Sequence, residues 1–413
     1  MKNTEILKNK SDEHLHFQGQ SAPVGFLKKI VHSRIKKAQF GRIEVTLPNQ
    51  QTISHLGKHP GHNVAIDFKS WKSLFQYMLS GQLAFVEAYI NGQIQISNLY
   101  ALCNWFLDNE KYFSKKQNSL ISDFINRFLH LVLNDNNREG SRKNISFHYD
   151  LGNDFYKKWL DETMTYSAGI FDETSDLRAS QIAKYDRIID QLELSPGDSV
   201  LEIGCGWGGF AEQAITNYPI DYHGITISKE QFDYAIRRLK KITVRKNLVA
   251  FEDYRDTAGK FDKIVSIEMF EAVGEKHWQS YFETIKNRLN PRGKAVIQVI
   301  TIDHQRYLKY RNRVDFIQKY IFPGGMLPSN QVFAEHTKKA GLKIVDEYSF
   351  GQDYALTLRH WKDNFLHNWP DIEKQGFDQR FYRLWLYYLD YCITAFERGT
   401  IDVMHYSIEH EHA

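Results

Sequence analysis

Hydrophobic and polar positions follow one pattern in the N-terminal third of the chain and another pattern beyond it. After polar residues 1–25, apolar runs at 41–51 (GRIEVTLPNQQ) and 64–68 (VAIDF) predict two β-strands, the first alternating and ending in turn residues. Over 69–107 the apolar residues recur at helical spacing, with one face formed by Trp71, Leu74, Phe75, Met78 and Leu79. These elements predict a small mixed α+β domain.

A second amphipathic stretch covers 117–134 and runs into the polar, glycine-containing segment NDNNREGSRKN. Its apolar positions are Leu120, Ile121, Phe124, Ile125, Phe128, Leu129 and Val132. Because the periodicity is lost in the polar segment, we place a linker at 136–145, between domains at 1–135 and 146–413.

Beyond the linker, apolar strand patterns alternate with helical ones. The strand patterns are SVLEIG, DYHGITI, NLVAFE, DKIVSIEMF and AVIQVITI. This alternation is typical of the α/β class and predicts a doubly wound, Rossmann-like parallel sheet with helices on both faces.

Composition agrees with two globular domains. The chain has 413 residues, of which 42% are hydrophobic and 25% charged, enough for two cores. The net charge of +3 is too small to indicate nucleic-acid binding. The basic residues are unevenly spread, however, and 26–40 predicts a short basic amphipathic helix that either lies on an anionic membrane or is simply solvated.

The cysteine count and the hydropathy of the chain indicate in which cellular compartment the protein is expected. Cys103, Cys205 and Cys392 are odd in number and far apart, so the sequence predicts neither a disulfide framework nor a metal site and fits a reducing cytoplasm. No run approaches the roughly 18 apolar residues that span a bilayer, and the first residues lack the apolar core of a signal peptide. We therefore expect any membrane contact to be peripheral.

The strongest chemical signal is the segment VLEIGCGWGG at 200–209, an apolar strand that opens into a glycine-rich turn. Gly204 and Gly206 allow the backbone to turn sharply and to approach a ligand at the carboxyl end of the strand. Glu202 lies within the strand, as in methyltransferases that bind S-adenosylmethionine (SAM), where an acidic residue orders this turn. A glycine turn that only packs a helix on a strand is the plainer alternative.

The second strand helps to choose between cofactors. An NAD enzyme usually carries Asp or Glu at its end to hold the ribose hydroxyls, but this chain has Thr226 and Ser228 there, with Gln231 shortly after. Uncharged polar groups still suit a ribose. The pattern therefore favours SAM over NAD.

Several segments from about 145 to the C-terminal end together resemble the cyclopropane fatty acid synthase family. They are HYDLGND, MTYS, LEIGCGWGG, GITIS with Gln231, EDYRD, MFEAVG, and YIFPGG with LPS. The resemblance implies a class I methyltransferase that transfers a one-carbon unit from SAM to the double bond of unsaturated acyl chains in membrane phospholipids, most simply forming cyclopropane fatty acids. The N-terminal region also resembles the small accessory, lipid-handling domain of the family.

The resemblance assigns roles to residues. It places the methionine part of SAM at Tyr166 and Ser167, the close backbone approach at Gly204 and Gly206, the ribose at Thr226 and Gln231, and the adenine side at Asp253 and Tyr254. The implied partner is a phospholipid bilayer met from its inner, cytoplasmic face, with no nucleic acid, and a homo-oligomer is left open.

Methylation of an alkene leaves a carbocation, so the site needs a base to remove a proton. In the family a bound bicarbonate is thought to act as that base, held by Cys, Glu, His and Tyr side chains and an Ile main chain. The matching positions are Glu271, Tyr354 and Ile300, but the Cys is Ala168 here and the His is Gln298.

These two departures leave three alternatives open. Bicarbonate binds with fewer ligands, or Glu271 acts directly as the base, or the product is a methyl-branched unsaturated chain.

Other classes fit the sequence less well. A non-catalytic lipid carrier would not need an intact glycine loop, and a small-molecule methyltransferase would not need YIFPGG or the accessory domain. In the tail, His405, His410 and His412 look like a metal site only superficially, because terminal segments are seldom ordered enough to hold one.

Overall fold

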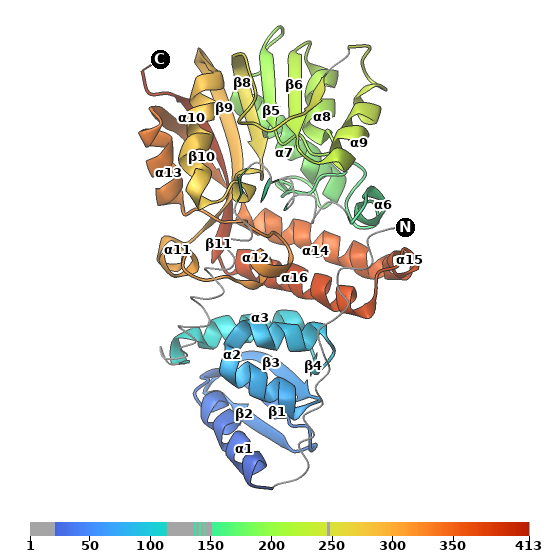
Figure 1. Cartoon of the computed structure of the whole chain (residues 1–413), viewed down its shortest axis with the longest axis vertical. Coiled ribbons are helices and arrows are strands. Elements are labelled where there is room, and N and C mark those ends of the chain that lie inside the picture. Colours follow the sequence, from blue (N-terminus) through green and yellow to red (C-terminus); the bar gives the residue numbers. More distant parts are fainter. Residues whose placement is uncertain are drawn as a thin grey trace.

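The computed structural model describes residues 21–113, 136–137, 140–141, 144, 151–245 and 248–412. The predicted amphipathic stretch at 117–134 and the residues from His148 to Asp150 lie outside these ranges, as does about half of the predicted linker. The described residues form three tiers, with a small α+β domain below, a layer of helices in the middle, and a large sheet flanked by helices above (Figure 1).

The small domain is built on a four-stranded sheet of order β2-β1-β3-β4. The strands are β1 (Phe40–Thr46), β2 (Thr52–Leu56), β3 (His59–Phe68) and β4 (Ile94–Ile96). Helix α1 (Ser21–Ile35) precedes them, α2 (Trp71–Ile90) connects β3 to β4, and α3 (Leu99–Asn109) and the 3-10 turn η1 (Glu110–Tyr112) follow β4. Both predicted strands are confirmed. The single helical stretch predicted over 69–107 is instead two helices separated by β4, and the first is kinked at Gly81, whose φ is +71°.

The basic helix predicted over 26–40 is confirmed in part as α1, which ends at Ile35, so that Lys36 and Lys37 lie beyond it and Phe40 begins β1. Its buried side carries Val31 and Ile35, which join the core of the small domain. Phe26 is 65% exposed, and Lys28 and Lys29 are also exposed. The helix therefore presents both an aromatic side chain and positive charge to solvent.

The upper domain contains a seven-stranded sheet of order β10-β11-β9-β8-β5-β6-β7. Its strands are β5 (Ser199–Ile203), β6 (Asp221–Thr226), β7 (Val249–Phe251), β8 (Phe261–Ile267), β9 (Leu289–Ile302), β10 (Leu342–Ser349) and β11 (Ile401–His410). The five strands from β9 to β7 are parallel, as the apolar runs predicted. Five helices flank this sheet, namely α7 (Leu177–Leu192), α8 (Gly209–Asn217), α9 (Lys229–Leu239), α10 (Trp278–Arg288) and α13 (Asn330–Lys339).

The C-terminal tail corrects the sequence analysis. It is not a loosely ordered segment, because β11 lies between β9 and β10 and is antiparallel to both. All residues from Val403 to Ile408 are buried. His405 lies opposite Gln298 in the register and has both ring nitrogens in hydrogen bonds, with Gln298 Oε1 at 3.0 Å and Gln191 Oε1 at 2.8 Å. His405 is tolerated inside the sheet because both of its ring nitrogens have hydrogen-bond partners, whereas Tyr406 Oη and Ser407 Oγ are buried without one.

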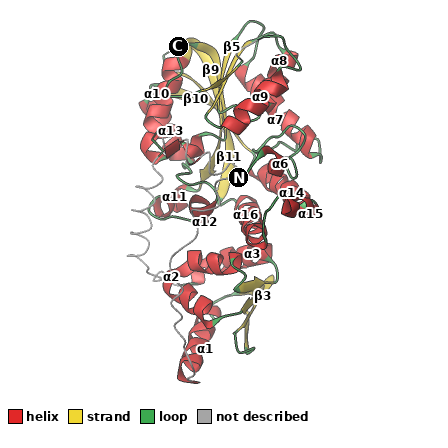
Figure 2. Ribbon diagram, turned by 45° about the vertical axis from the view of Figure 1, so that its right-hand side comes forward, coloured by secondary structure: helices red, strands yellow, loops and turns green. Residues whose placement is uncertain are grey.

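The middle tier joins the two domains. It comprises α11 (His304–Tyr310), α12 (Phe316–Tyr320), α14 (Gly351–His367), α15 (Trp369–Lys374) and α16 (Gln379–Glu397), beside the short helix α6 (Asn153–Tyr156). Helix α3 packs on β3 and on α16, and so lies between the lower sheet and the middle tier (Figure 2). Tyr100 Oη donates to Glu397 at 2.6 Å across this contact, and Arg306 pairs with Glu110 at 2.8 Å. A single hydrophobic cluster runs through both domains.

No helix in the described part of the chain has the length and hydropathy that crossing a membrane requires.

Candidate active site

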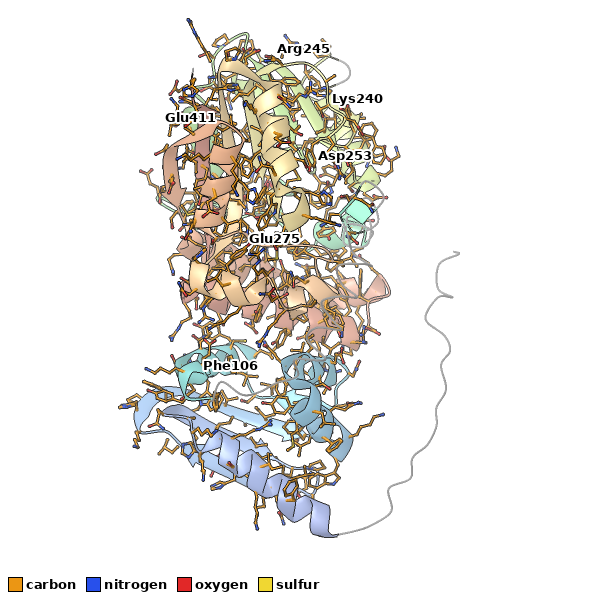
Figure 3. The ribbon with its side chains drawn as sticks, turned by 60° about the vertical axis from the view of Figure 1, so that its left-hand side comes forward. Phe106, Lys240, Arg245, Asp253, Glu275 and Glu411 are labelled. Carbon is orange, nitrogen blue, oxygen red and sulfur yellow. The ribbon has the colours of Figure 1, made fainter. Side chains whose placement is uncertain are left out.

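A cavity of about 1590 Å³ opens at the carboxyl ends of the parallel strands. The eight residues predicted to contact SAM line it together with Glu202, which is predicted to order the glycine turn, and so do Glu271, Ile300 and Tyr354. The cavity continues past α14 and α16 to apolar side chains of the small domain. Figure 3 labels one lining residue from each end, Asp253 in the upper domain and Phe106 on α3.

The glycine loop leaves β5 after Ile203. Gly204 and Gly206 have φ of +83° and +52°, which L side chains rarely adopt. A Cβ on Gly204 would lie 2.8 Å from Met269 Cγ, whereas a Cβ on Gly206 would meet no protein atom within 4 Å. Since Gly206 lines the cavity, its bare backbone leaves room for a ligand to approach.

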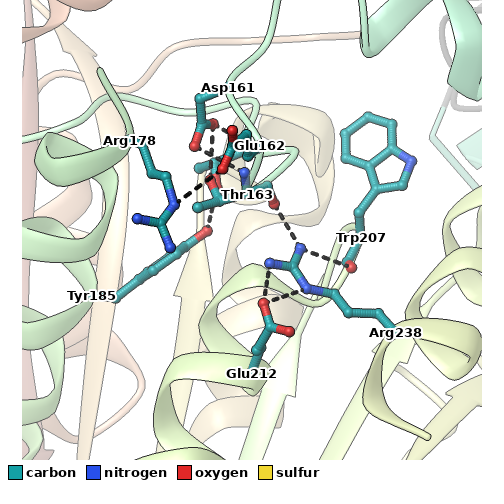
Figure 4. Close-up of polar contacts among 9 residues, drawn as sticks. Asp161, Glu162, Thr163, Arg178, Tyr185, Trp207, Glu212 and Arg238 are labelled. Atoms are coloured by element: carbon teal, nitrogen blue, oxygen red, sulfur yellow. Dashed lines mark hydrogen bonds and ion pairs between the residues drawn. The ribbon is translucent and has the colours of Figure 1, made fainter. Parts of the chain in front are cut away.

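A second loop, which carries Tyr166 and Ser167, is tied to the glycine loop by Arg238 of α9 (Figure 4). The guanidinium donates to the carbonyl oxygens of Thr163 at 2.6 Å and Trp207 at 3.5 Å, and to Glu212 at 2.8 Å. This brace fixes the spacing of the two loops.

The side chains at 166 and 167 are also held in place. Tyr166 Oη lies 2.9 Å from Tyr388 Oη. Lys184 Nζ donates to Ser167 Oγ at 2.7 Å and to Gln181 Oε1 at 2.8 Å. Burial lowers the pKa of the Lys184 ammonium to about 7, against the opposing effect of the Glu268 carboxylate.

Glu202 lies under the glycine loop and accepts a hydrogen bond from Tyr222 Oη. Burial raises the pKa of its carboxyl group to about 8. The second strand and its helix supply Thr226 and Gln231, whose side chains are 3.0 Å apart. Polar groups thus surround the position expected for a ribose.

After β7, Asp253 receives three hydrogen bonds from Arg255, from the backbone N–H at 3.0 Å and from the guanidinium at 2.8 and 2.6 Å. The same guanidinium donates to Asn136 O at 3.1 Å, and Asn136 Nδ2 donates to Gly324 O at 2.8 Å. Asn136 lies in the predicted linker, is buried and lines the cavity. The domain boundary at 136–145 stays a prediction.

Glu271 follows β8 in the turn η2 (Phe270–Ala272). Its Oε1 accepts the backbone N–H of Ile300, while its buried Oε2 has no hydrogen-bond partner. Burial, and then repulsion from Glu268, raises the pKa of this carboxyl group to about 8. Glu271 is therefore mostly protonated near neutral pH.

Glu268 is the residue that the sequence analysis missed. It stands directly after β8, lines the cavity and accepts three hydrogen bonds. Ala168 N donates to Oε1 at 2.9 Å, Gln298 Nε2 donates to Oε1 at 2.6 Å, and Tyr354 Oη donates to Oε2 at 2.7 Å. An acidic residue at the end of an apolar strand is a signal that the sequence carried.

The side chains of Gln298 and Tyr354 therefore both donate hydrogen bonds to Glu268, whereas the main-chain N–H of Ile300 donates to Glu271. Gln298 is fully buried and does not line the cavity. The predicted roles of these residues in holding an anion stay predictions. In the described residues, no group of three or more His, Cys, Asp or Glu side chains could hold a metal ion.

Comparison with known proteins gives a consistent result. The profile of the family described as mycolic acid cyclopropane synthetase matches residues 136–406. A tuberculostearic acid methyltransferase of Mycobacterium tuberculosis is 39% identical over 287 residues, 67% of this chain and 67% of the relative. The cyclopropane-fatty-acyl-phospholipid synthase of Escherichia coli is 39% identical over 257 residues, 62% of this chain and 65% of that enzyme.

Among solved structures, a mycolic acid cyclopropane synthase complexed with SAH (S-adenosylhomocysteine) and CTAB is 30% identical and superposes with a TM-score of 0.59, covering 65% of this chain and 97% of that one. These findings confirm the predicted fold class, the methyltransferase activity and SAM as the cofactor. The family match covers the sheet as far as Tyr406 in β11, both loops and the carboxylates of the cavity, and so this chain belongs to the cyclopropane synthase family of SAM-dependent lipid methyltransferases.

Proposed function

We propose that this enzyme methylates the double bond of an unsaturated acyl chain in a membrane phospholipid and then closes a cyclopropane ring. One observation carries the proposal, namely a continuous cavity that joins the polar loops predicted to bind SAM to apolar side chains of the small domain. Its volume of about 1590 Å³ exceeds the roughly 300–1,000 Å³ of ordinary ligand sites, which leaves space for a cofactor and an acyl chain together.

The reaction requires that the alkene is aligned with the methyl group and that water is excluded from the site. SAM supplies a methyl group on a sulfonium that is already primed to leave. The alkene is a weak nucleophile, so the chain has to hold its double bond against that methyl group and keep water from the resulting cation. Tyr166, Phe322 and Tyr388 line the cavity with aromatic faces that stabilise positive charge.

The phospholipid reaches the enzyme at the inner face of the membrane, to which the protein binds peripherally. Supporting this step, α1 exposes Phe26, Lys28 and Lys29. The residues just after α1 include the exposed Lys36 and Lys37. Each cation near an anionic bilayer contributes about 1 kcal/mol of binding free energy.

The surroundings of Ala168 favour a second product, a methyl-branched unsaturated chain. Ala168 has no polar side chain, and its backbone N–H is already used by Glu268. If the site does not direct deprotonation to the added methyl group, the cation loses a neighbouring proton and a methyl-branched unsaturated chain results. The similarity to a tuberculostearic acid methyltransferase, at the same 39% identity as to the cyclopropane synthase, also supports this alternative.

The test uses SAM with a trideuterated methyl group and vesicles of a monounsaturated phospholipid, followed by mass spectrometry of the released fatty acids. A cyclopropane keeps two deuterium atoms, because the third leaves during ring closure. A methyl-branched alkene formed by loss of a neighbouring proton keeps all three. Vesicles of a saturated phospholipid are the control, and equal labelling of both lipids, or of neither, would contradict the proposal.

A further inference from the structure

The backbone holds Glu268 in an unusual conformation. Its φ of +49° lies in the left-handed region, which costs a non-glycine residue about 1 kcal/mol. Its N–H donates to Gln298 O at 2.9 Å, which anchors the turn to β9. The strained turn is thus fixed by the sheet itself, and it directs the carboxylate toward donors from three other segments.

Those three donors favour the charged form of the side chain. An ionised carboxylate only accepts hydrogen bonds, and the N–H of Ala168, the amide of Gln298 and the hydroxyl of Tyr354 all donate to it. Burial raises the pKa of the Glu268 carboxyl group, and the three donors and the Lys184 ammonium oppose that effect by stabilising the carboxylate.

His405 contacts the Gln298 amide oxygen, while the amide nitrogen contacts Glu268. His405 Nε2 lies 3.0 Å from Gln298 Oε1, so the His405 tautomer with its proton on Nε2 donates to the amide oxygen and leaves the NH₂ group facing Glu268. An amide keeps this role at every pH, because it does not titrate.

Glu271 has the opposite environment. It receives one backbone hydrogen bond at Oε1, and its buried Oε2 has no partner. Of these two buried carboxyl groups, Glu268 has the surroundings that better stabilise a carboxylate, and Glu271 has those that better stabilise the neutral acid.

We propose that the Glu268 carboxylate is the general base of the reaction, in the place that a bicarbonate would otherwise take. The inference rests on the proposed function. Tyr354 and Gln298, which the family resemblance assigns to the anion, are already engaged by this side chain, and a second anion beside it would be repelled.

The step balances without a further reactant. The alkene electron pair forms the bond to the methyl carbon as the sulfur–methyl bond breaks. Glu268 then takes a proton from the added methyl group, and the C–H electron pair closes the ring. The proton passes to solvent when the lipid leaves.

The experiment compares Glu268→Gln and Glu271→Gln with Glu283→Gln, an exposed control on α10. Loss of a general base costs a factor of about 10² to 10⁴, so we expect Glu268→Gln to lose that much turnover while calorimetry shows SAM binding retained. Glu271→Gln should lose at least tenfold less. The reverse ranking would overturn the assignment.

A chemical rescue separates a base from a merely structural role. Glu268→Gly suits the positive φ and opens room for a small carboxylate. We expect added formate or bicarbonate to raise the turnover of this variant at least tenfold and to leave wild-type turnover unchanged. Wild-type activity that requires bicarbonate, or Glu268 variants that turn over like wild type, would disprove the proposal. A wild-type enzyme that methylates no lipid would instead disprove the proposed function.

Discussion

The protonation of Glu271 can be tested without any catalytic assay, through the pH dependence of stability. Glu271→Gln imitates the neutral carboxyl group, since the amide oxygen can still accept the Ile300 N–H and the NH₂ group replaces the unpartnered Oε2. The substitution removes only the ability to ionise. Wild type and variant should therefore differ only where Glu271 titrates.

The sign follows from the direction of the shift. The pKa of Glu271 rises on folding from 4.5 to about 8, so the folded protein binds the proton more tightly. This contribution to the free energy of unfolding is fully present below pH 4.5 and is lost as the pH rises through the folded pKa. Each pH unit in that window changes it by about 1.4 kcal/mol, so wild type should have lost on the order of 3 kcal/mol relative to the variant at about pH 7.

The measurement is chemical denaturation followed by tryptophan fluorescence at several pH values from about 5 to 8.5. The difference in unfolding free energy between Glu271→Gln and wild type should grow steadily with pH and level off near pH 8. Glu283→Gln, exposed on α10, should follow the wild-type curve. A wild-type curve parallel to that of Glu271→Gln would show that Glu271 is ionised in the folded protein and would refute the assignment of the two carboxyl groups.

Three further outcomes are expected. Gly206→Val should abolish SAM binding in calorimetry because the valine side chain projects into the cavity. The control Gly399→Val, at an exposed glycine with a similar φ of +60°, should bind SAM normally. SAM binding by Gly206→Val would place the cofactor elsewhere. Arg238→Met removes the brace between the two SAM-binding loops and should weaken SAM binding about tenfold, and unchanged affinity would mean that the loops hold their spacing without it. The protein should co-sediment with anionic vesicles, less so as salt is added, and equal partition onto neutral vesicles would exclude the electrostatic contribution of α1.

Periodicity located the parallel strands because each buries a short apolar run. VLEI became β5, and the runs containing ITI, VAF and IVSI became β6, β7 and β8. The same criterion failed for β11, whose sequence IDVMHYSIEH mixes charged and polar residues with apolar ones. Its place in the sheet depends on long-range partners such as Gln298 and Gln191, which no local pattern shows.

The site was predicted to a similar extent. Glycine spacing and motif resemblance selected residues that all line the cavity, because the predicted roles depend on local backbone shape. Glu268 was overlooked because its importance arises from donors at 168, 298 and 354, which only the folded sheet brings together.

The position of β11 has a consequence for synthesis. During translation β11 leaves the ribosome after every other strand of its sheet, yet it fills the gap between β9 and β10. Until Ile401–His410 has emerged, the nascent chain exposes two unpaired strand edges, which invite aggregation or chaperone binding. His405 is also missing at that stage, so nothing orients the Gln298 amide. The site therefore becomes competent only after β11 has been added to the sheet, and a chain that stops before Ile401 would be exposed to degradation without being able to modify a lipid.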